Sequence, residues 1–228
     1  MSIYSYVLRY DDGVAPNPFF DFCTLAVCKP VIRRKAQVGD WIIGTGSKEN
    51  VNYDDDIPRI IYAMQVQEVL PLTAYYEDSR FEKKKPRPFP TLWTGDNFYR
   101  NWDGKIIQME SVHSNVDSSE NLENKEHDLC GVNVLISQKF KYWGRKAIKL
   151  PDKFQIYVKK GQGHKKITDE TLISKFEKWY DKQYPPFKMV PCQPLFPIDE
   201  GGDYILDKMS PVKCFREDCK PEQEEEVI

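Results

Sequence analysis

The sequence has no long hydrophobic run. No apolar stretch in its 228 residues approaches the roughly 18 residues that a membrane-crossing helix needs. The first residues, Met-Ser-Ile-Tyr-Ser-Tyr, show no basic region followed by an apolar stretch, so we expect no secretory signal. We therefore expect a cytoplasmic protein that makes no contact with a membrane.

An excess of charge of one sign is also missing. Lys and Arg number 33 and Asp and Glu 35, which gives a formal net charge of −2. This balance argues against a general, sequence-blind DNA coat, but a local basic patch could still neutralise phosphates. The strongest such patch is Lys83-Lys84-Lys85-Pro86-Arg87. A run of this kind is usually a solvated loop.

The six cysteines do not indicate a disulfide framework. A chain of this length does not need disulfides, and no export signal precedes it, so free thiols are expected. Cys23 and Cys28 have a spacing that zinc sites allow, as do Cys214 and Cys219. In a strand, however, Cys23 and Cys28 would face opposite sides, so we predict no metal site and no cofactor.

The chain reads as short strands with few helices. Forty per cent hydrophobic and 13 per cent aromatic residues suffice for a core. Pro30 is well placed to begin a helix, and Thr168-Asp169-Glu170 to begin another. A polar stretch, 114–127, reads as an exposed loop. The expected strands are 3–10, 23–28, 41–46, 60–70, 105–110 and 128–138; the expected helices are 30–36 and 169–183, with a helical face over 72–79.

This order of elements favours a small β-barrel over an alternating parallel sheet. We expect one domain over residues 1–184. Proline and irregular spacing after Pro185 predict an extended arm over 185–228, and its acidic end, Glu222 to Glu226, is expected to be a disordered tail.

One segment resembles a known superfamily of barrels. Gly39-Asp40-Trp41-Ile42-Ile43-Gly44, followed by Ile60-Ile61-Tyr62-Ala63-Met64-Gln65-Val66, is similar to the core of PUA-like barrels, which include the EVE and YTH readers of modified bases. The resemblance implies an α+β fold: a PUA-like mixed or antiparallel β-barrel with packing helices, a C-terminal helix and the arm. It also implies a ligand pocket beside the second of these strands.

A more specific pattern covers most of residues 1–145. Its parts are Ala15-Pro16-Asn17-Pro18-Phe19, Cys23 to Arg33, Gly39-Asp40-Trp41-x-x-Gly44, Ile61 to Met64, Asp78-x-Arg80-Phe81 and Gly95-Asp96-Asn97-x-Tyr99. Together they resemble the second family of nucleotide modification associated domains of phages and bacteria. Those families were linked to DNA base hypermodification by genomic neighbourhood. The resemblance implies a nucleotide or nucleic acid as partner.

The residues of this pattern offer the groups that bind a base. Trp41 could stack on an extruded base, Asn17 and Asn97 could read a base edge, and Asp40, Asp78 and Asp96 could accept from exocyclic amines. Ser47, in the glycine-bounded stretch after Gly44, could meet a nucleotide through backbone N–H groups. Each also has a structural explanation, with Trp41 in the core, Asn17 in a turn and Asp78 paired with Arg80. The residues predicted to hold phosphate are Lys29, Arg33, Arg80 and Lys84.

Three functions remain open. The first is binding of a nucleotide or a flipped, modified base in a pocket lined by Trp41. The second is an enzyme that modifies bases or nucleotides with Asp40, Asp78 or Asp96 as acid–base groups; a thiol–imidazole pair of Cys23 or Cys130 with His113 is a further option. The third is a protein-interaction component of a phage or defence system. The ligand and the oligomeric state are not predicted.

Overall fold

The computed structural model describes residues 1–8, 11–46, 58–87, 95–183 and 225–227. Within these ranges the fold is mixed α+β, as the sequence predicts, and it contains a seven-stranded sheet, a three-stranded sheet and a two-stranded hairpin. No helix within the described ranges is long and apolar enough to cross a bilayer. The described strands are not closed into a barrel, so the PUA-like barrel stays a prediction.

The main sheet is built around the N-terminal strand. Its central strand β1 pairs in parallel with β3 on one side and antiparallel with β11 on the other. β9 (Phe140–Tyr142) adds to β4 beside β10. The order along the sheet is β10 (Ile148–Lys149), β4 (Arg59–Gln65), β3 (Trp41–Gly46), β1 (Ile3–Leu8), β11 (His164–Ile167) and β12 (Glu225–Val227).

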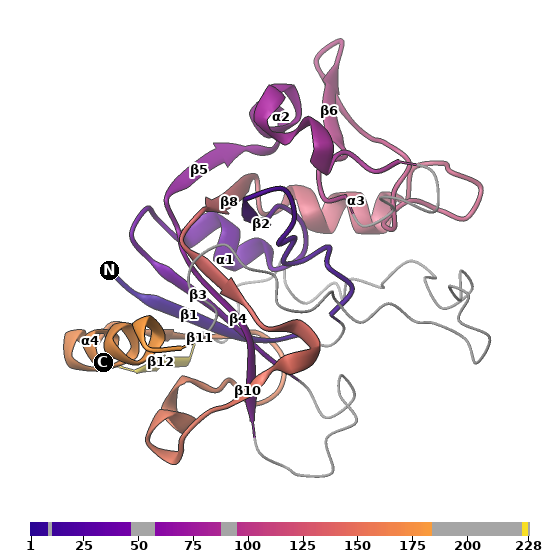
Figure 1. Cartoon of the computed structure of the whole chain (residues 1–228). Helices are drawn as coiled ribbons and strands as arrows, with labels where there is room; N and C mark the ends of the chain where they lie inside the picture. The colour runs from indigo at the N-terminus through magenta and orange to yellow at the C-terminus, as the bar shows by residue number, and fades with distance from the viewer. Residues whose placement is uncertain (9–10, 47–57, 88–94, 184–224, 228) are drawn as a thin grey trace.

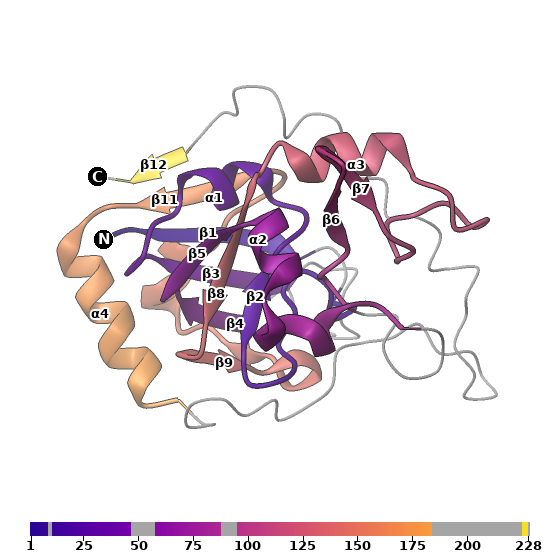
Figure 2. The ribbon, with the colours of Figure 1, turned by 90° about the horizontal axis from the view of Figure 1, so that it is seen from above.

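The second sheet continues from the first. β4 leads through Val66 and Gln67 into β5 (Glu68–Pro71), which pairs with β8 (Asn133–Ser137); β2 (Cys23–Leu25) pairs with the other edge of β8. The 60–70 run is therefore two strands instead of the single predicted one. Beyond this sheet lies the hairpin of β6 (Tyr99–Trp102) and β7 (Lys105–Gln108). Figures 1 and 2 show this hairpin and α4 at opposite ends of the molecule.

The described helices pack against the sheets and the β6–β7 hairpin. α1 (Pro30–Lys35) begins at the proline, as predicted, and α4 (Glu170–Asp181) begins after Asp169, whose side chain accepts from the N–H groups of Thr171 and Leu172. α2 (Leu72–Glu77) and α3 (Leu122–Leu129) flank the β6–β7 hairpin. The 3₁₀ turns are η1 (Ser79–Lys84), η2 (Gly144–Lys146) and η3 (Asp152–Tyr157).

Two expectations about loops are wrong. Residues 114–127 are not wholly a loop, because α3 begins at Leu122 with Asn121 as its N-cap, and this helix also takes the first residues of the strand expected over 128–138. The acidic tail is not wholly disordered, because Glu225–Val227 form β12 beside β11. The rest of the predicted arm lies outside the described residues.

Three apolar clusters fill the spaces between these elements. The first lies between one face of the main sheet, α1 and the second sheet, and includes Tyr6 and Ile42. The second lies under α4 and includes Trp41 and Phe176. Because Ile42 and Trp41 are neighbours in β3, the main sheet is buried on both faces, which explains its almost uniformly apolar strands. The third cluster fills the lobe of α2, β6 and the second sheet.

Candidate functional site

A buried polar network lies at the base of the lobe that carries the β6–β7 hairpin. The Lys84 ammonium, which is fully buried, donates to the backbone oxygens of Asn17 (3.1 Å) and Phe22 (3.0 Å), to Asn17 Oδ1 (2.6 Å) and to Thr24 Oγ1 (3.0 Å). Asp96 accepts from Thr24 Oγ1 (2.5 Å) and from the Tyr75 hydroxyl (2.8 Å). Loop 15–19, η1 and the start of β6 are thus tied together by one cation and one carboxylate.

The charges in this network shift each other's proton affinity. Burial lowers the pKa of Lys84 to about 8, although Asp96 and Cys23 oppose the shift. Burial likewise raises the pKa of Asp96, while Lys84, Thr24 and Tyr75 act to lower it. A buried cation bound to four oxygens is positioned to hold a fold together. In this structure the Lys84 ammonium is therefore occupied by the fold, and its contact with a phosphate stays a prediction.

Asn97 follows this network and lines a pocket. Its side-chain nitrogen donates to the backbone oxygens of Tyr75 (3.1 Å) and Phe81 (3.2 Å), which fixes the orientation of the amide. The side-chain oxygen, Oδ1, is buried and has no hydrogen-bond partner among the described residues, and Asn97 as a whole is 1% exposed. A buried acceptor without a partner costs about 1–3 kcal/mol, so a donor from a water or a ligand beside Asn97 would stabilise this arrangement.

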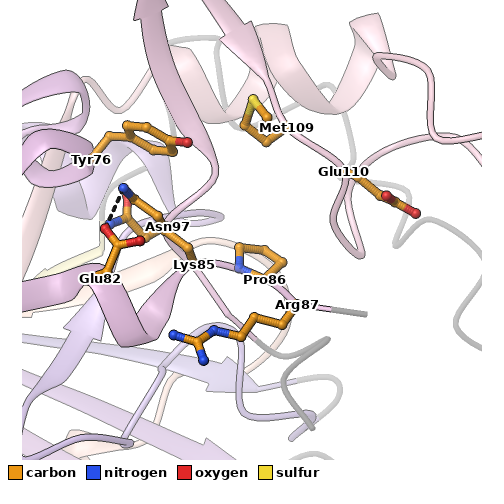
Figure 3. Close-up of a pocket in the computed structure, with 8 residues that line it drawn as sticks. All are labelled: Tyr76, Glu82, Lys85, Pro86, Arg87, Asn97, Met109 and Glu110. Atoms are coloured by element: carbon orange, nitrogen blue, oxygen red, sulfur yellow. Dashed lines mark hydrogen bonds and ion pairs between the residues drawn. The ribbon is translucent and has the colours of Figure 1, made fainter. Parts of the chain in front are cut away.

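The pocket has a volume of about 340 Å³, within the range of small-molecule sites. Figure 3 shows its lining side chains, which come from α2, η1, the segment after η1, the residues before β6 and the residues after β7. Lys85 lies 4.1 Å from the centroid of the Tyr76 ring and 2.6 Å from Glu82. The lining residues are Tyr76, Glu82, Lys85, Pro86, Arg87, Asn97, Met109 and Glu110.

This set of groups suits an uncharged polar ligand with a flat, partly apolar body. Two cations, Lys85 and Arg87, are offset by two carboxylates, Glu82 and Glu110. Pro86 and Met109 supply apolar surface. An amide oxygen that accepts, an aromatic ring and a near-neutral wall are groups with which proteins bind a base or a nucleoside.

Comparison with protein families gives one match. The model of nucleotide modification associated domain 2 matches residues 1–194. The chain belongs to this family. No curated protein and no solved structure matches the chain. Membership of this family indicates a role in nucleotide modification. The matched residues, 1–194, include the buried network and the pocket.

Trp41 does not line the pocket of this member of the nucleotide modification associated domain 2 family. It is 0% exposed and packs edge-on against Tyr180 and Phe176 of α4, with ring centroids 4.6 and 5.3 Å apart. Its indole N–H donates to Glu177 of the same helix (3.1 Å). The predicted stacking platform is therefore a core residue, because α4 covers the face that would meet a base.

Other predicted residues are held by the fold. Asp40 accepts from the backbone N–H groups of Ser2 (2.7 Å) and Gln37 (3.0 Å), which closes the turn before β3. Asp78 pairs with Arg80 on the surface, and Arg80 also contacts Glu68 (2.8 Å). The contact with Arg80 lowers the pKa of Asp78. In this structure these carboxylates and Arg80 are therefore occupied by one another and by backbone.

The two remaining phosphate candidates differ in exposure. Arg33 is fully buried and donates to the backbone oxygens of Ala26, Cys28 and Asp128, so the fold occupies its guanidinium and its contact with a phosphate stays a prediction. Lys29 is partly exposed and lies 5.1 Å from the centroid of the Tyr6 ring. Ser47 lies outside the described residues.

The predicted residues Asn17, Lys84, Asp96 and Asn97 thus lie close together in the described part of the chain, and Asn97 lines the pocket. The other pocket residues were missed, although Lys85 and Arg87 belong to the basic run noted in the sequence. Tyr76, Met109 and Glu110 carry no local signal, because each becomes part of the pocket only when the β6–β7 hairpin folds beside α2. Among the described residues, no group of three or more His, Cys, Asp or Glu side chains is arranged to hold a metal ion.

Proposed function

We propose that this protein binds a nucleotide or an extruded, modified base in the pocket beside Asn97. The observation that carries the proposal is the buried Asn97 Oδ1, an acceptor without a partner among the described residues in the wall of a 340 Å³ cavity. An exocyclic amine or a ring N–H of a base supplies the missing donor. The family membership supports the same ligand class.

The charges of the pocket favour the base over the phosphate as the main point of recognition. Glu82 forms an ion pair with Lys85, which leaves that ammonium less available to a second anion. Arg87 is exposed at the rim and is the cation best placed for the phosphate of a bound nucleotide. We therefore expect specificity from the amide and the ring, and a modest contribution from one phosphate contact.

A base that is part of DNA has to leave its stack to enter such a pocket. Extrusion costs a few kcal/mol and is easiest for single-stranded DNA. Binding to a short single strand is therefore expected to be tighter than binding to the matching duplex. Tighter binding of a strand with a modified base would identify the protein as a reader of modified DNA.

The test is a fluorescence anisotropy titration at two salt concentrations. The probes are short single strands and duplexes that contain thymine, 5-hydroxymethyluracil or 5-hydroxymethylcytosine, with deoxynucleoside monophosphates as competitors. Arg87→Ala is expected to weaken binding by about fivefold, because a lost phosphate contact is typically worth about 1 kcal/mol.

Lys83→Ala is the matched control. It removes the same charge from the same basic run, but Lys83 is exposed and does not line the pocket. Its affinity should stay within twofold of the wild type. Equal losses in both variants would mean non-specific attraction to the basic run, and an absence of binding to every probe would refute the proposal.

A further inference from the structure

Three residues that lie far apart in the sequence meet on the inner side of the same lobe. Cys28 follows β2, His113 follows β7, and Asp128 lies in α3. The Cys28 sulfur is 3.8 Å from His113 Nε2, and His113 Nδ1 is 2.6 Å from Asp128 Oδ2. A thiol, an imidazole and a carboxylate in this order are the nucleophile, the base and the orienting group of covalent catalysis.

Asp128 holds the other two members in place. Its Oδ1 accepts from the backbone N–H of Cys28 (2.8 Å), and its Oδ2 accepts from the Tyr99 hydroxyl (2.8 Å) as well as meeting His113. The carboxylate is fully buried, and His113 is 2% exposed. Because Nδ1 faces the carboxylate, Nε2 is the nitrogen that faces the thiol and exchanges a proton with it.

The electrostatics favour a charged imidazole beside the sulfur. Burial alone would lower the pKa of His113, but the Asp128 carboxylate and the Cys28 thiol outweigh burial and raise it well above its usual value. Burial would raise the pKa of Asp128, but His113 and the Arg33 guanidinium lower it to about 2. An adjacent imidazolium is the usual means by which a protein converts a thiol to the reactive thiolate.

The other charged and titratable groups near the thiol are few among the described residues. Asp12, in the loop after β1, acts on both Cys28 and His113, and burial raises the pKa of this carboxyl. Arg33 Nε donates to the Cys28 backbone oxygen (2.8 Å). His127 Nδ1 lies 3.9 Å from Asp128 Oδ1. The Tyr6 hydroxyl also interacts with the Cys28 thiol, and the Asp12 carboxylate opposes formation of a thiolate.

Cys28 differs from Cys23 in the two respects that matter for reactivity. Cys23 is 0% exposed inside the first apolar cluster, and burial raises the pKa of its thiol. Cys28 is partly exposed and adopts a left-handed backbone with a φ of 55°, as does Lys29 after it with a φ of 42°. Such left-handed backbone conformations are energetically costly in residues other than glycine and are concentrated at functional sites. The cysteine that lies beside His113 is thus Cys28, whereas the sequence predicted Cys23 or Cys130.

We propose that Cys28, His113 and Asp128 form a nucleophilic thiol site that acts on the carbonyl carbon of an ester or an amide. None of the three residues lines the pocket beside Asn97, so this activity goes beyond the proposed binding function and does not depend on it. Cys28 is the nucleophile, His113 is the general acid and base, and Asp128 is a positioning residue.

The reaction has two balanced steps. In the first, the Cys28 thiolate forms a bond to the carbonyl carbon, the bond from that carbon to the leaving oxygen or nitrogen breaks, and His113 gives its Nε2 proton to the leaving alcohol or amine. In the second, His113 takes a proton from water, the water oxygen bonds to the thioester carbon, and the carbon–sulfur bond breaks. The products are the alcohol or amine, a carboxylic acid that keeps the second proton of the water, and the regenerated thiolate–imidazolium pair.

The first experiment uses p-nitrophenyl acetate with the full chain and follows both p-nitrophenol release and the intact mass. We expect one acetyl group, placed on Cys28 by peptide mapping, while Cys23 in the same sample stays unmodified. Cys28→Ser should lose the thioester. His113→Gln keeps a donor near Asp128 but removes the base, so acylation should slow by about 10²–10⁴-fold.

The second experiment measures alkylation of Cys28 by iodoacetamide as a function of pH. An ordinary thiol has a pKa of about 8.5, so the wild type should react more than tenfold faster than His113→Gln at about pH 6. This measurement needs no substrate, and circular dichroism of each variant checks the fold. Coincident pH profiles for wild type and His113→Gln, or acetyl groups placed only on residues other than Cys28, would overturn the proposal.

Discussion

Two basic side chains that would ordinarily face solvent are enclosed in this protein. The Lys84 ammonium lies within hydrogen-bond distance of four oxygens, and Arg33 donates to the backbone oxygens of Ala26, Cys28 and Asp128. Sequence reasoning placed both at a phosphate, because Lys and Arg are rarely buried and their partners here are mostly backbone oxygens. Every residue has a backbone oxygen, so no local sequence pattern predicts these contacts.

At the same scale, Trp41 is expected to matter for stability more than for binding. Trp41→Ala would open a cavity between β3 and α4 and leave Glu177 without its indole donor. Substitutions of this kind cost about 3–5 kcal/mol. Urea unfolding should show this loss, with a much smaller loss for Trp41→Phe.

A loss of binding without a loss of stability would instead support the prediction that Trp41 stacks on a base. A Trp41→Ala protein that unfolds at the wild-type urea concentration but no longer binds any DNA probe would mean that α4 opens to admit a base. The anisotropy titration and the unfolding curve on one preparation separate the two outcomes.

At the scale of elements, the segment 95–99 is the clearest link between sequence and site. A Cβ on Gly95 would lie 2.4 Å from the Lys84 backbone oxygen, so only glycine fits there. Asp96 joins the buried network, Asn97 lines the pocket, and the Tyr99 hydroxyl contacts Asp128. The sequence identified this segment by resemblance alone, and the structure gives a physical role to each residue.

α3 was missed for a physical reason. Its buried residues are Asn124, His127 and Asp128, so the face that it turns inward is polar. α3 therefore lacks the apolar face that marks α4, and no proline marks its start as Pro30 marks that of α1. The thiol site was missed for the same reason, since Asp128 is one of those residues and Cys28 is 100 positions away from it.

The His113–Asp128 pair gives α3 a pH dependence that can be measured. Asp128 contributes stability above its ordinary pKa of 3.8, and this contribution is lost as the pH falls toward about 2. His113 contributes stability below its ordinary value of 6.5, and this contribution is lost as the pH rises through its raised pKa.

The stability advantage of wild type over His113→Gln should therefore be largest between pH 3.8 and 6.5 and shrink on both sides. Urea unfolding at a series of pH values measures it. An advantage that does not vary with pH would show that His113 stays neutral in the folded protein.

At the scale of the molecule, the sequence predicted several strands of the main sheet but not the order in which they pair. The sequence showed most of β1, β3 and β4, whereas the pairing of β1 with β11 joins Ile3 to Ile167. β11 is only four residues long and half basic, His-Lys-Lys-Ile, so it has no strand pattern of its own. Tertiary pairing makes it a strand.

β12 makes a testable contribution to this sheet. Glu225 pairs with Lys165 and Val227 with Ile167. A chain that ends at Glu224 should show faster amide exchange in β11, because the N–H groups that face β12 lose their acceptors. β3, which lies between β1 and β4, serves as the reference and should exchange as before. Unchanged exchange in β11 would mean that β12 is not paired in solution.

The pairing of β1 with β11 also has a consequence for how the protein is made. β1 is synthesised before β11, although the two strands pair, and the paired residues Ile3 and Ile167 lie far apart in the sequence. Until β11 is synthesised, one edge of an apolar strand has no partner, and closing so long a loop is slow. The nascent chain therefore exposes one unpaired edge of β1 until His164–Ile167 are made, and such an edge is prone to pair with other chains.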